Sequence, residues 1–290
     1  MDEIVLNSTL VRKFFHCGTL RKDYCPKQIY RTTIKKDLDF QSLAMKQGAL
    51  FETLCLGSGI KGQVTEDLPR LRNGERTAAH KRILAQALTF KKLCHDHQII
   101  ITKENTQVEI TKKLGDGVFL RGTLDIFPVA ILLEDSGYTL SIIDLKLCKN
   151  LSNTWGEYPW GEIHRLDRIQ GEIYHYLIQD VDFSLNPHID TPLFKNALRH
   201  AANAKFLYWV FEHSPAMRNG FFPIDQDSAS QSEMIETLRK TYKLVQHYNK
   251  LGWDKTFPSK ENCTHCPLRD SCSDYYFLDT KKGDISAPSH

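Results

Sequence analysis

Cysteines at opposite ends of the chain constrain its fold more than any other feature. Near the end, Cys263, Cys266 and Cys272 follow the pattern C-x2-C-x5-C. Such spacing gathers thiolates around a metal, but three thiolates are one short of the four that structural zinc sites and iron–sulfur clusters take. The fourth must come from elsewhere, and Cys25 and Cys17 are the upstream candidates. A metal centre built in this way would join the two ends of one folded unit.

The identity of that metal stays open at this point. All-cysteine ligation suits zinc and an iron–sulfur cluster equally, and His265 is a further candidate ligand between Cys263 and Cys266. We predict that the remaining cysteines are small buried hydrophobic residues. These are Cys55, Cys94 and Cys148.

The composition indicates a globular chain whose net charge selects no partner. The chain has 290 residues, of which 41% are hydrophobic, so it can build a sizeable core and we predict one domain over residues 1–290. Within it, residues 1–38 and 252–278 would contribute the cysteine cluster, and residues 279–290 would form a polar tail. Because 38 basic residues face 35 acidic ones, any nucleic-acid contact must come from local patches.

The first residues lack the basic start and the apolar run of a signal peptide, and no apolar stretch is long enough to cross a bilayer. These features predict a cytoplasmic protein that contacts no membrane. In that compartment cysteines are reduced, bound to metal or buried rather than paired in disulfides.

The hydrophobic pattern predicts helices, then a run of strands, then alternating helices and one more strand. This order is typical of an α/β fold with a mixed central sheet flanked by helices. The expected helices cover residues 39–56, 76–95, 161–181 and 230–251, and the expected strands cover residues 107–112, 118–127, 138–147 and 205–212.

One strand carries two charges on an otherwise apolar background. Side chains alternate along a strand, so Ile143, Leu145 and Leu147 should face one side, and Asp144 and Lys146 the other. Burying such charges costs free energy unless they are paired or bind a metal. A structural Asp–Lys pair is the alternative to a functional site.

D-x-K alone is a weak signal, because Asp279-Thr280-Lys281 matches it within the polar tail. The first D-x-K gains weight from Asp125, which ends the motif G-x-x-D on the preceding strand. Adjacent strands can bring Asp125 and Asp144 side by side, where repulsion between like charges favours a divalent cation.

Two further motifs accompany these strands. Gln170 and Tyr174 are four residues apart on an expected helix, so they should share a face. Glu52 is a charge within an apolar helical stretch. Each of them alone is compatible with an ordinary helix surface.

Taken in this order, the motifs resemble the PD-(D/E)xK nuclease superfamily over most of the chain, from about Ser8 to Cys272. More narrowly, they resemble its iron–sulfur branch, which includes RecB-like and AddB-type nucleases, exonuclease V and CRISPR-associated iron–sulfur exonucleases. The resemblance implies a restriction-endonuclease-like core whose N- and C-terminal ends are joined by a metal cluster. The chain departs from many members at Glu52, where they carry a histidine, and at Asp144, where glutamate is commoner.

The resemblance assigns roles to residues by motif. Mg²⁺ or Mn²⁺ would be held by Asp125, Asp144 and Glu52 together with the carbonyl of Leu145. Lys146 would be the catalytic lysine, and Gln170 and Tyr174 would position the substrate strand. The ligands of a [4Fe–4S] cluster would be Cys25, Cys263, Cys266 and Cys272, with zinc as the alternative metal.

The function implied by this resemblance is a metal-dependent deoxyribonuclease, an exonuclease that prefers single-stranded ends and serves DNA repair or recombination. Alternatives are an endonuclease on the same fold, a non-catalytic DNA-binding scaffold stabilised by zinc, and a zinc-stabilised regulatory protein.

Aromatic and basic residues follow the D-x-K strand. The segment from Trp155 to Trp160, with His164, Arg165 and Arg168, suits stacking on unpaired bases and phosphate contacts. A loop anchored by its tryptophans is equally compatible with this composition. Further candidates for phosphate contacts, or for plain solvated surface, are Lys35, Lys36, Arg70, Arg72 and Arg76.

Overall fold

The computed structural model describes residues 3–21, 24–37, 42–57, 68, 70–133, 137–151, 168–224, 228–253, 266 and 272. The chain divides into two compact units. The first comprises Met1–Asn7 and Gln41–Met234, and the second comprises Ser8–Phe40 and Ile235–His290. The predicted catalytic residues all belong to the first unit, and the predicted cluster cysteines belong to the second. The single domain expected over residues 1–290 stays a prediction. Within the described residues, no helix is both long and apolar enough to span a membrane.

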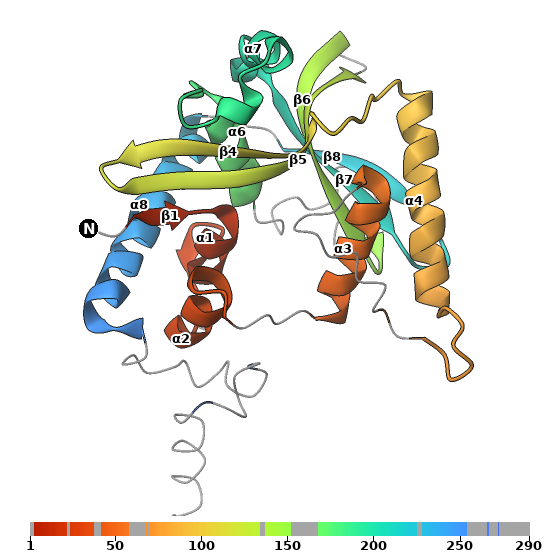
Figure 1. Cartoon of the computed structure of the whole chain (residues 1–290), viewed down its shortest axis with the longest axis horizontal. Helices are drawn as coiled ribbons and strands as arrows, with labels where there is room; N and C mark the ends of the chain where they lie inside the picture. The colour runs from red at the N-terminus through yellow and green to blue at the C-terminus, as the bar shows by residue number, and fades with distance from the viewer. Residues whose placement is uncertain are drawn as a thin grey trace, which may run out of the picture. The chain divides into compact units, whose positions relative to one another are not determined.

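The first unit is built on a six-stranded mixed sheet in the order β1-β5-β6-β7-β8, with β4 paired to β5 (Figure 1). The β1–β5 and β6–β7 pairs are parallel, and the other pairs are antiparallel. This confirms the predicted α/β class with a mixed central sheet. The strands are β1 (Ile4–Leu6), β4 (Thr106–Gly115), β5 (Val118–Leu133), β6 (Gly137–Cys148), β7 (Lys205–Glu212) and β8 (Asn219–Ile224).

Strand β5 is 16 residues long and serves several neighbours. One of its edges pairs with β4 as far as Ile126. The other edge pairs with β1 up to Leu120 and with β6 from Ile126 onward. Residues 121–125 therefore have no strand partner on this second edge among the described strands. Asp125 is the last residue before the pairing with β6 begins.

Helices α3 (Leu43–Leu56) and α4 (Ala78–Asp96) pack on one face of the sheet. Burial of each large apolar side chain there contributes about 1.5–3 kcal/mol. The core on this face includes Phe51, Ile83, Phe90, Ile143, Leu145, Leu207, Trp209 and Phe211. The odd-numbered residues of β6 and β7 thus face α3 and α4, which follows from the alternation of side chains along a strand.

The starts of both helices differ from the prediction, which placed them at residues 39 and 76. Ser42 and Thr77 adopt extended backbone conformations, and their side chains accept hydrogen bonds from Met45 N and His80 N. Such N-caps satisfy amide groups that have no partner within the helix, so α3 begins at Leu43 and α4 at Ala78.

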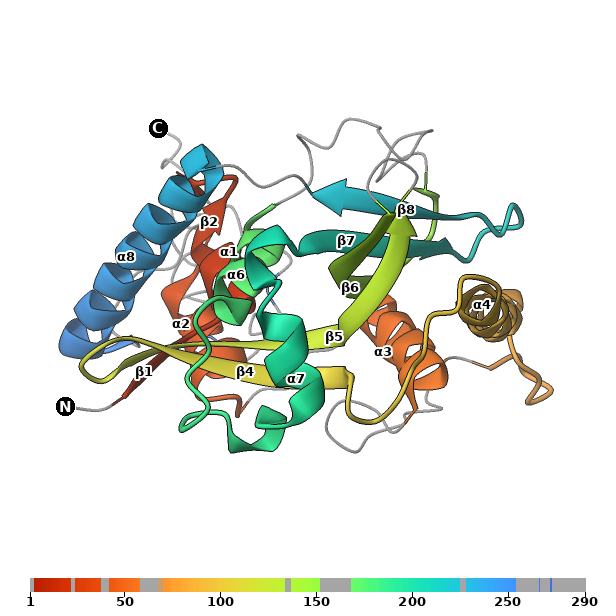
Figure 2. The same cartoon turned by 90° about the horizontal axis from the view of Figure 1, so that it is seen from above.

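Helix α6 (Ile169–Ile178) covers the opposite face, where the ring of Tyr174 meets Phe206 of β7 edge-on at 6.0 Å. In Figure 2, α6 and α3 lie on opposite sides of β6. The prediction extended this helix to residue 181, but Gln179 is extended and ends it at Ile178. Residues 161–167 of the predicted helix lie outside the described part of the chain.

The remaining elements are short or lie largely in the second unit. The first unit also contains α7 (Pro192–Leu198) and the 3-10 turns Pro187–Ile189 and Ala201–Asn203. Helix α8 (Ser228–Leu251) passes from the first unit into the second. The second unit further contains α1 (Ser8–Phe14), β2 (Phe15–His16), β3 (Thr19–Leu20), α2 (Pro26–Ile29) and the π-helix Tyr30–Ile34.

Two glycines bring α6 close to the sheet. A Cβ on Gly122 of β5 would lie 2.6 Å from Leu177 Cδ1 and 3.0 Å from Tyr174 Cε1. A Cβ on Gly171 of α6 would lie 2.7 Å from Cδ1 of Phe206, a fully buried ring. The glycine of G-x-x-D therefore leaves room for the side chains of Leu177 and Tyr174, which pack directly on the strand.

We predict that Gly122→Ala and Gly171→Ala each lower the free energy of unfolding by about 1–3 kcal/mol, because overpacking forces the helix away from the sheet. Urea denaturation followed by circular dichroism measures the change. The matched control is Gly48→Ala in α3, where a Cβ would have nothing within 4 Å. It should stabilise the protein by up to about 1 kcal/mol, since alanine favours helix. Wild-type stability of Gly171→Ala would contradict the packing argument.

Candidate active site

The D-x-K sequence lies in the middle of the sheet, on strand β6. Ile143 and Leu145 belong to the core beneath α3 and α4, and Leu147 packs against that core. Asp144 is turned to the other face, where its exposure is only 1%. The predicted alternation is confirmed, and it leaves a carboxylate buried within the sheet.

Strands β5 and β6 separate just where the acids lie. Ile126 pairs with Ile143, and continuing this register would place Asp125 opposite Asp144. At this point a hydrogen bond to the side chain of Asp125 replaces the backbone pairing between the strands. Its Oδ2 atom accepts a hydrogen bond of 2.8 Å from the backbone N–H of Leu145.

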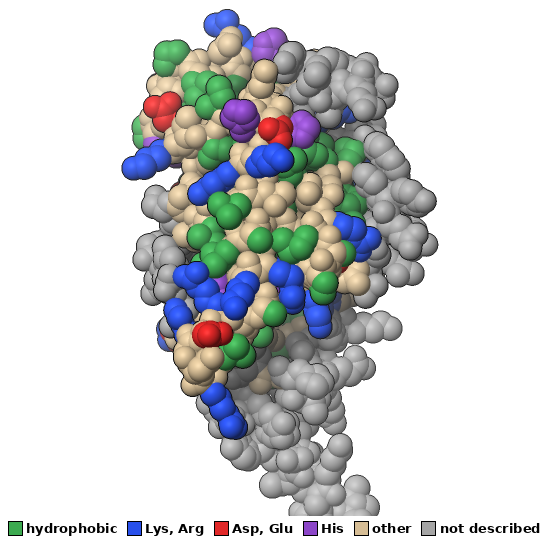
Figure 3. Space-filling view, turned by 90° about the vertical axis from the view of Figure 1, so that its right-hand side faces the viewer, with side chains coloured by type: hydrophobic (Ala, Val, Ile, Leu, Met, Phe, Trp, Pro, Cys, Tyr) green, Lys and Arg blue, Asp and Glu red, His purple; other side chains and the backbone are tan. Residues whose placement is uncertain are grey.

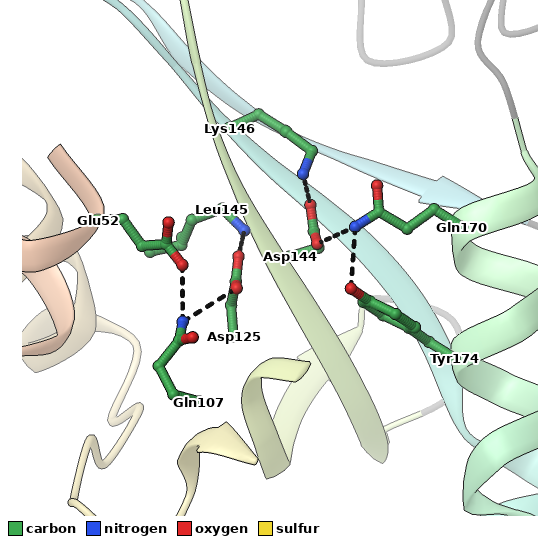
Figure 4. A network of polar contacts seen from close by, with 8 residues as sticks. All are labelled: Glu52, Gln107, Asp125, Asp144, Leu145, Lys146, Gln170 and Tyr174. Carbon is green, nitrogen blue, oxygen red and sulfur yellow. Dashed lines mark hydrogen bonds and ion pairs between the residues drawn. The ribbon is translucent and has the colours of Figure 1, made fainter. Parts of the chain in front are cut away.

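On one side of β6, Glu52 and Asp125 form an acid pair (Figure 4). Their carboxyl groups lie within hydrogen-bonding range of each other. Gln107 of β4 bridges them, because its Nε2 donates to Glu52 Oε1 at 2.6 Å and to Asp125 Oδ1 at 3.1 Å. Helix α3 supplies Glu52 to this pair, so three elements meet here.

The acid pair is electrostatically unfavourable in the absence of a cation. Burial raises the pKa of Asp125 to about 8, and the charge of Glu52 adds to the rise. Burial also raises the pKa of Glu52, and the charge of Asp144 acts in the same direction. Lys146 lowers the pKa of both carboxyl groups without overcoming these effects. Two buried carboxylates of this kind favour a cation between them.

On the other side of β6, Asp144 lies in a second polar set. It forms an ion pair with Lys146 through Oδ2, and its Oδ1 accepts a hydrogen bond of 2.7 Å from Gln170 Nε2. Gln170 Nε2 also donates to Tyr174 OH at 3.2 Å, which confirms that these two residues share a helix face. The Lys146 ammonium lies 5.6 Å from the centre of the Tyr208 ring.

The two polar sets meet through consecutive residues of β6. The sequence predicts Asp125 and Asp144 side by side. The carboxylate that contacts Asp125 in the structure belongs to Glu52, whereas Asp144 contacts Lys146 and Gln170 (Figure 4). Because Asp144 and Lys146 both influence the pKa of Glu52, the two sets form one electrostatic site.

The oxygen atoms of this site fit a hard divalent cation. Mg²⁺ is commonly held by one or two protein carboxylates, with water and phosphate oxygens as further ligands. Glu52 and Asp125 supply such a pair. Among the described residues, no group of three or more His, Cys, Asp or Glu side chains is placed to hold a metal ion. A cation at this site would therefore need further ligands besides these two carboxylates, such as other oxygen atoms of the protein, water or phosphate.

The structure places the predicted cluster cysteines only in part. Cys25 is buried as the N-cap residue of α2, while Cys266 and Cys272 are partly exposed and Cys263 lies outside the described residues. Cys17, the alternative ligand, is exposed. A metal cluster joining the ends of the chain is accordingly not seen in the described part of the chain.

Aromatic rings pack against one another in the second unit. Phe14 stacks on Tyr248 at 6.2 Å, Tyr248 lies 5.0 Å from Trp253, and the hydroxyls of Tyr24 and Tyr248 are 2.8 Å apart. These ring contacts and this hydrogen bond join the segment after Ser8 to the end of α8.

Of the cysteines predicted to be buried, Cys55 and Cys94 are buried, whereas Cys148 is only partly buried. Burial raises the pKa of the Cys94 and Cys148 thiols to about 12 and raises that of Cys55 as well. A thiol that resists ionisation is a poor metal ligand and a poor nucleophile.

The predicted nucleic-acid contacts are placed only partly. The segment 155–165 lies outside the described residues, and Arg168 is the N-cap residue of α6. Lys35 and Lys36 are exposed, and Lys35 pairs with Asp37 at 2.9 Å. Figure 3 shows more Lys and Arg than Asp and Glu side chains on the face that α4 occupies. Exposed basic residues in α4 and the segment before it include Arg70, Arg72, Arg76, Lys81 and Lys91.

Sequence reasoning missed Gln107. It was assigned to a strand but not to the site. Counting back from the turn Gly115-Asp116-Gly117 along the hairpin would have placed it opposite Asp125, since Thr106 pairs with Ile126 and Val108 with Leu124.

Comparison with known proteins gives one family and a structural likeness. The family described as "PD-(D/E)XK nuclease superfamily" matches residues 33–273. No curated protein matches the chain. The crystal structure of a "putative exonuclease" from Eubacterium rectale is similar, with a TM-score of 0.57 and 13% identity over 99% of this chain and 90% of that one. A second structure, SSO0001, has a TM-score of only 0.37 and 14% identity over 94% and 87%, which is too low to indicate a shared fold.

We predict that the metal-free protein loses stability between about pH 4 and pH 8 because of Asp125. Its pKa is about 8 in the fold and ~4 in an unfolded chain, so the folded state binds the proton more tightly. The stability from this proton is present at low pH and disappears as the pH rises through 8. Urea denaturation in EDTA at pH 6 and pH 8 measures the loss, and Asp125→Asn should reduce it. An unchanged pH dependence in this variant would contradict the assignment.

Proposed function

Because the chain belongs to the PD-(D/E)XK nuclease superfamily, we propose that it is a metal-dependent deoxyribonuclease that hydrolyses phosphodiester bonds. The observation that carries this proposal is the buried set of charges at the point where β5 and β6 separate. Asp125, Asp144 and Lys146 meet there with Glu52, and burying Asp125 and Asp144 without function would be costly.

Each side chain has a task that its position supports. Glu52, Asp125 and Asp144 would hold Mg²⁺ or Mn²⁺, with the carbonyl of Leu145 as a further ligand. When bound, the cation supplies a coordinated water of lowered pKa and neutralises phosphate oxygens. The Lys146 side chain is 34% exposed while its partner Asp144 is 2% exposed, so the ammonium can reach a substrate. It would orient the attacking water or stabilise developing negative charge.

Gln170 and Tyr174 form a hydrogen-bonded chain with Asp144 in the structure. The amide of Gln170 is engaged with Asp144 and with Tyr174, which fixes the carboxylate in the sheet. We therefore propose that α6 orients Asp144. The additional role in positioning the DNA strand stays a prediction.

We further propose that the chain acts as an exonuclease and prefers single-stranded ends. Two observations support this proposal. The Eubacterium rectale protein of similar fold bears the name "putative exonuclease", and the segment from Trp155 to Arg168 has the aromatic and basic composition of a single-strand path. An endonuclease on the same fold is the alternative. A non-catalytic scaffold is disfavoured because Asp125, Asp144 and Lys146 are all present and in contact with partners.

We predict that Asp144→Asn and Lys146→Ala each lower DNA cleavage at least ~100-fold. Lys146→Ala removes the positive charge that would stabilise the transition state, and Asp144→Asn removes the carboxylate that pairs with Lys146. Both should fold and bind DNA, as judged by circular dichroism and fluorescence anisotropy. The assay digests end-labelled single- and double-stranded DNA with Mg²⁺ or Mn²⁺. Asp279→Ala is the matched control, since its D-x-K lies in the tail, and it should cleave like the wild type. Wild-type rates in both site variants would contradict the site.

Covalently closed circular DNA, tested in the same assay, distinguishes an exonuclease from an endonuclease. An exonuclease should degrade linear DNA and leave the circles intact. Nicking of circles as fast as linear DNA would favour the endonuclease.

We also propose that the second unit carries a [4Fe–4S] cluster held by Cys25, Cys263, Cys266 and Cys272, with zinc as the alternative. All four belong to segments of this one unit, and Cys25 is buried there. Hydrolysis transfers no electrons, so we assign to the cluster a structural role. In the chain-entropy model a cross-link that closes a loop of about 100 residues contributes ~4–5 kcal/mol, and this loop is longer.

We predict that Cys25→Ser yields colourless, poorly stable protein, whereas Cys94→Ser keeps the brown colour of a cluster. The reason is that Cys94 is a protonated thiol in the core of the other unit. Visible absorbance with iron and sulfide analysis of anaerobically purified protein makes the comparison. Colourless wild-type protein containing zinc and no iron would overturn the cluster and leave the nuclease proposal standing.

A further inference from the structure

Gln107 has an unusual backbone for a strand residue. It lies in β4 between Thr106 and Val108, which pair with Ile126 and Leu124, so it is opposite Asp125. Its φ is +53°, in the left-handed region that side chains other than glycine rarely adopt. Strain of this kind persists where the surrounding structure holds it, often at functional sites. Here it directs the side chain at the acid pair.

The amide of Gln107 takes the place of a positive charge. Its Nε2 lies 2.6 Å from Glu52 Oε1 and 3.1 Å from Asp125 Oδ1, so one N–H2 group serves two carboxylates. Hydrogen bonds to carboxylates are short and strong because the acceptor is charged. The amide therefore holds together two acids that otherwise repel each other.

The other end of the same amide has no partner. Gln107 Oε1 is buried and accepts no hydrogen bond in the described structure. A buried carbonyl oxygen without a partner is unfavourable, and such atoms call for a functional explanation. Amide oxygens are ligands for hard cations, and a half turn about the terminal bond of glutamine exchanges its nitrogen for its oxygen.

We propose that Gln107 completes the cation site of Glu52 and Asp125. Without a cation its N–H2 group clamps the two carboxylates, and with a cation its Oε1 is a protein ligand. This proposal rests on the proposed metal-dependent nuclease. It adds an amide oxygen to the acid pair, which Gln107 already bridges in the described structure.

Gln107→Met tests the proposal, because methionine has nearly the same length and neither donor nor oxygen. The readout is Mn²⁺ affinity of the full chain, measured by electron paramagnetic resonance and titration calorimetry without DNA. We expect the Kd to rise ~10–100-fold, the range found when groups supporting a metal site are lost. We also expect the melting temperature in EDTA to fall.

The chain offers a matched control in Gln86 of α4. It is fully buried, its Nε2 donates to Glu212 O at 2.7 Å and to Arg218 O at 3.2 Å, and its Oε1 also lacks a hydrogen-bond partner. Gln86→Met should lower the melting temperature and leave the Kd for Mn²⁺ unchanged. A Kd of Gln107→Met within about twofold of the wild type would overturn the proposal.

Gln107→Glu separates an oxygen ligand from a mere donor. It keeps an oxygen and loses the N–H2 group, so we expect Mn²⁺ to bind at least as tightly as to the wild type. Its melting temperature in EDTA should fall and should rise more on Mn²⁺ addition than that of the wild type. Mn²⁺ binding as weak as in Gln107→Met would overturn the ligand role.

Mn²⁺ binding by the wild type shows whether a negative result contradicts the role of Gln107 or the proposed metal-dependent nuclease. If the wild type binds no Mn²⁺, the metal-dependent site itself is wrong and the role of Gln107 is wrong with it. If the wild type binds Mn²⁺ and Glu52→Gln abolishes binding while Gln107→Met does not, only the inference about Gln107 is wrong.

Discussion

The site depends on one hydrogen bond, from the backbone N–H of Leu145 to Asp125 Oδ2. It lies where β5 stops pairing with β6, and it satisfies a backbone donor that the separated strands leave without a ladder partner. A buried N–H without an acceptor would be costly, so the carboxylate serves both the fold and the site. Through this bond the G-x-x-D strand is fixed to the D-x-K strand, and the positions of Glu52, Gln107 and Asp144 follow from it.

The charges around this bond are balanced by hydrogen bonds more than by cations. Lys146 pairs with Asp144, and the amides of Gln170 and Gln107 serve Asp144 and the acid pair. The pKa of Asp125 remains raised, because amide dipoles compensate a buried negative charge only in part. A buried polar network of this kind gives up stability in exchange for a prepared binding site for positive charge.

The sequence predicted those parts of the site that depend on local periodicity. The period of two along β6 separated Asp144 from Ile143 and Leu145, and the helical period paired Gln170 with Tyr174. It did not reveal Gln107, because that role depends on a hairpin register and a left-handed backbone. Periodicity alone did not bring Glu52 to Asp125, since a helix far away in sequence supplies it, and only the family resemblance assigned both residues to one site. The short strands β1 and β8 were missed because three to six residues carry little periodicity.

The candidate catalytic residues and the candidate cluster cysteines belong to different units of the chain. The acids, Lys146 and Gln107 all belong to the unit built on the six-stranded sheet, where buried carboxylates create a demand for positive charge. Cys25 belongs to the other unit, whose described residues form a two-stranded sheet and stack rings such as Phe14 and Tyr248. A small unit with a limited core gains most from a cross-link, since the area that it can bury is small. We therefore propose that hydrolysis takes place at the sheet, and that the cysteines would stabilise the unit to which they belong.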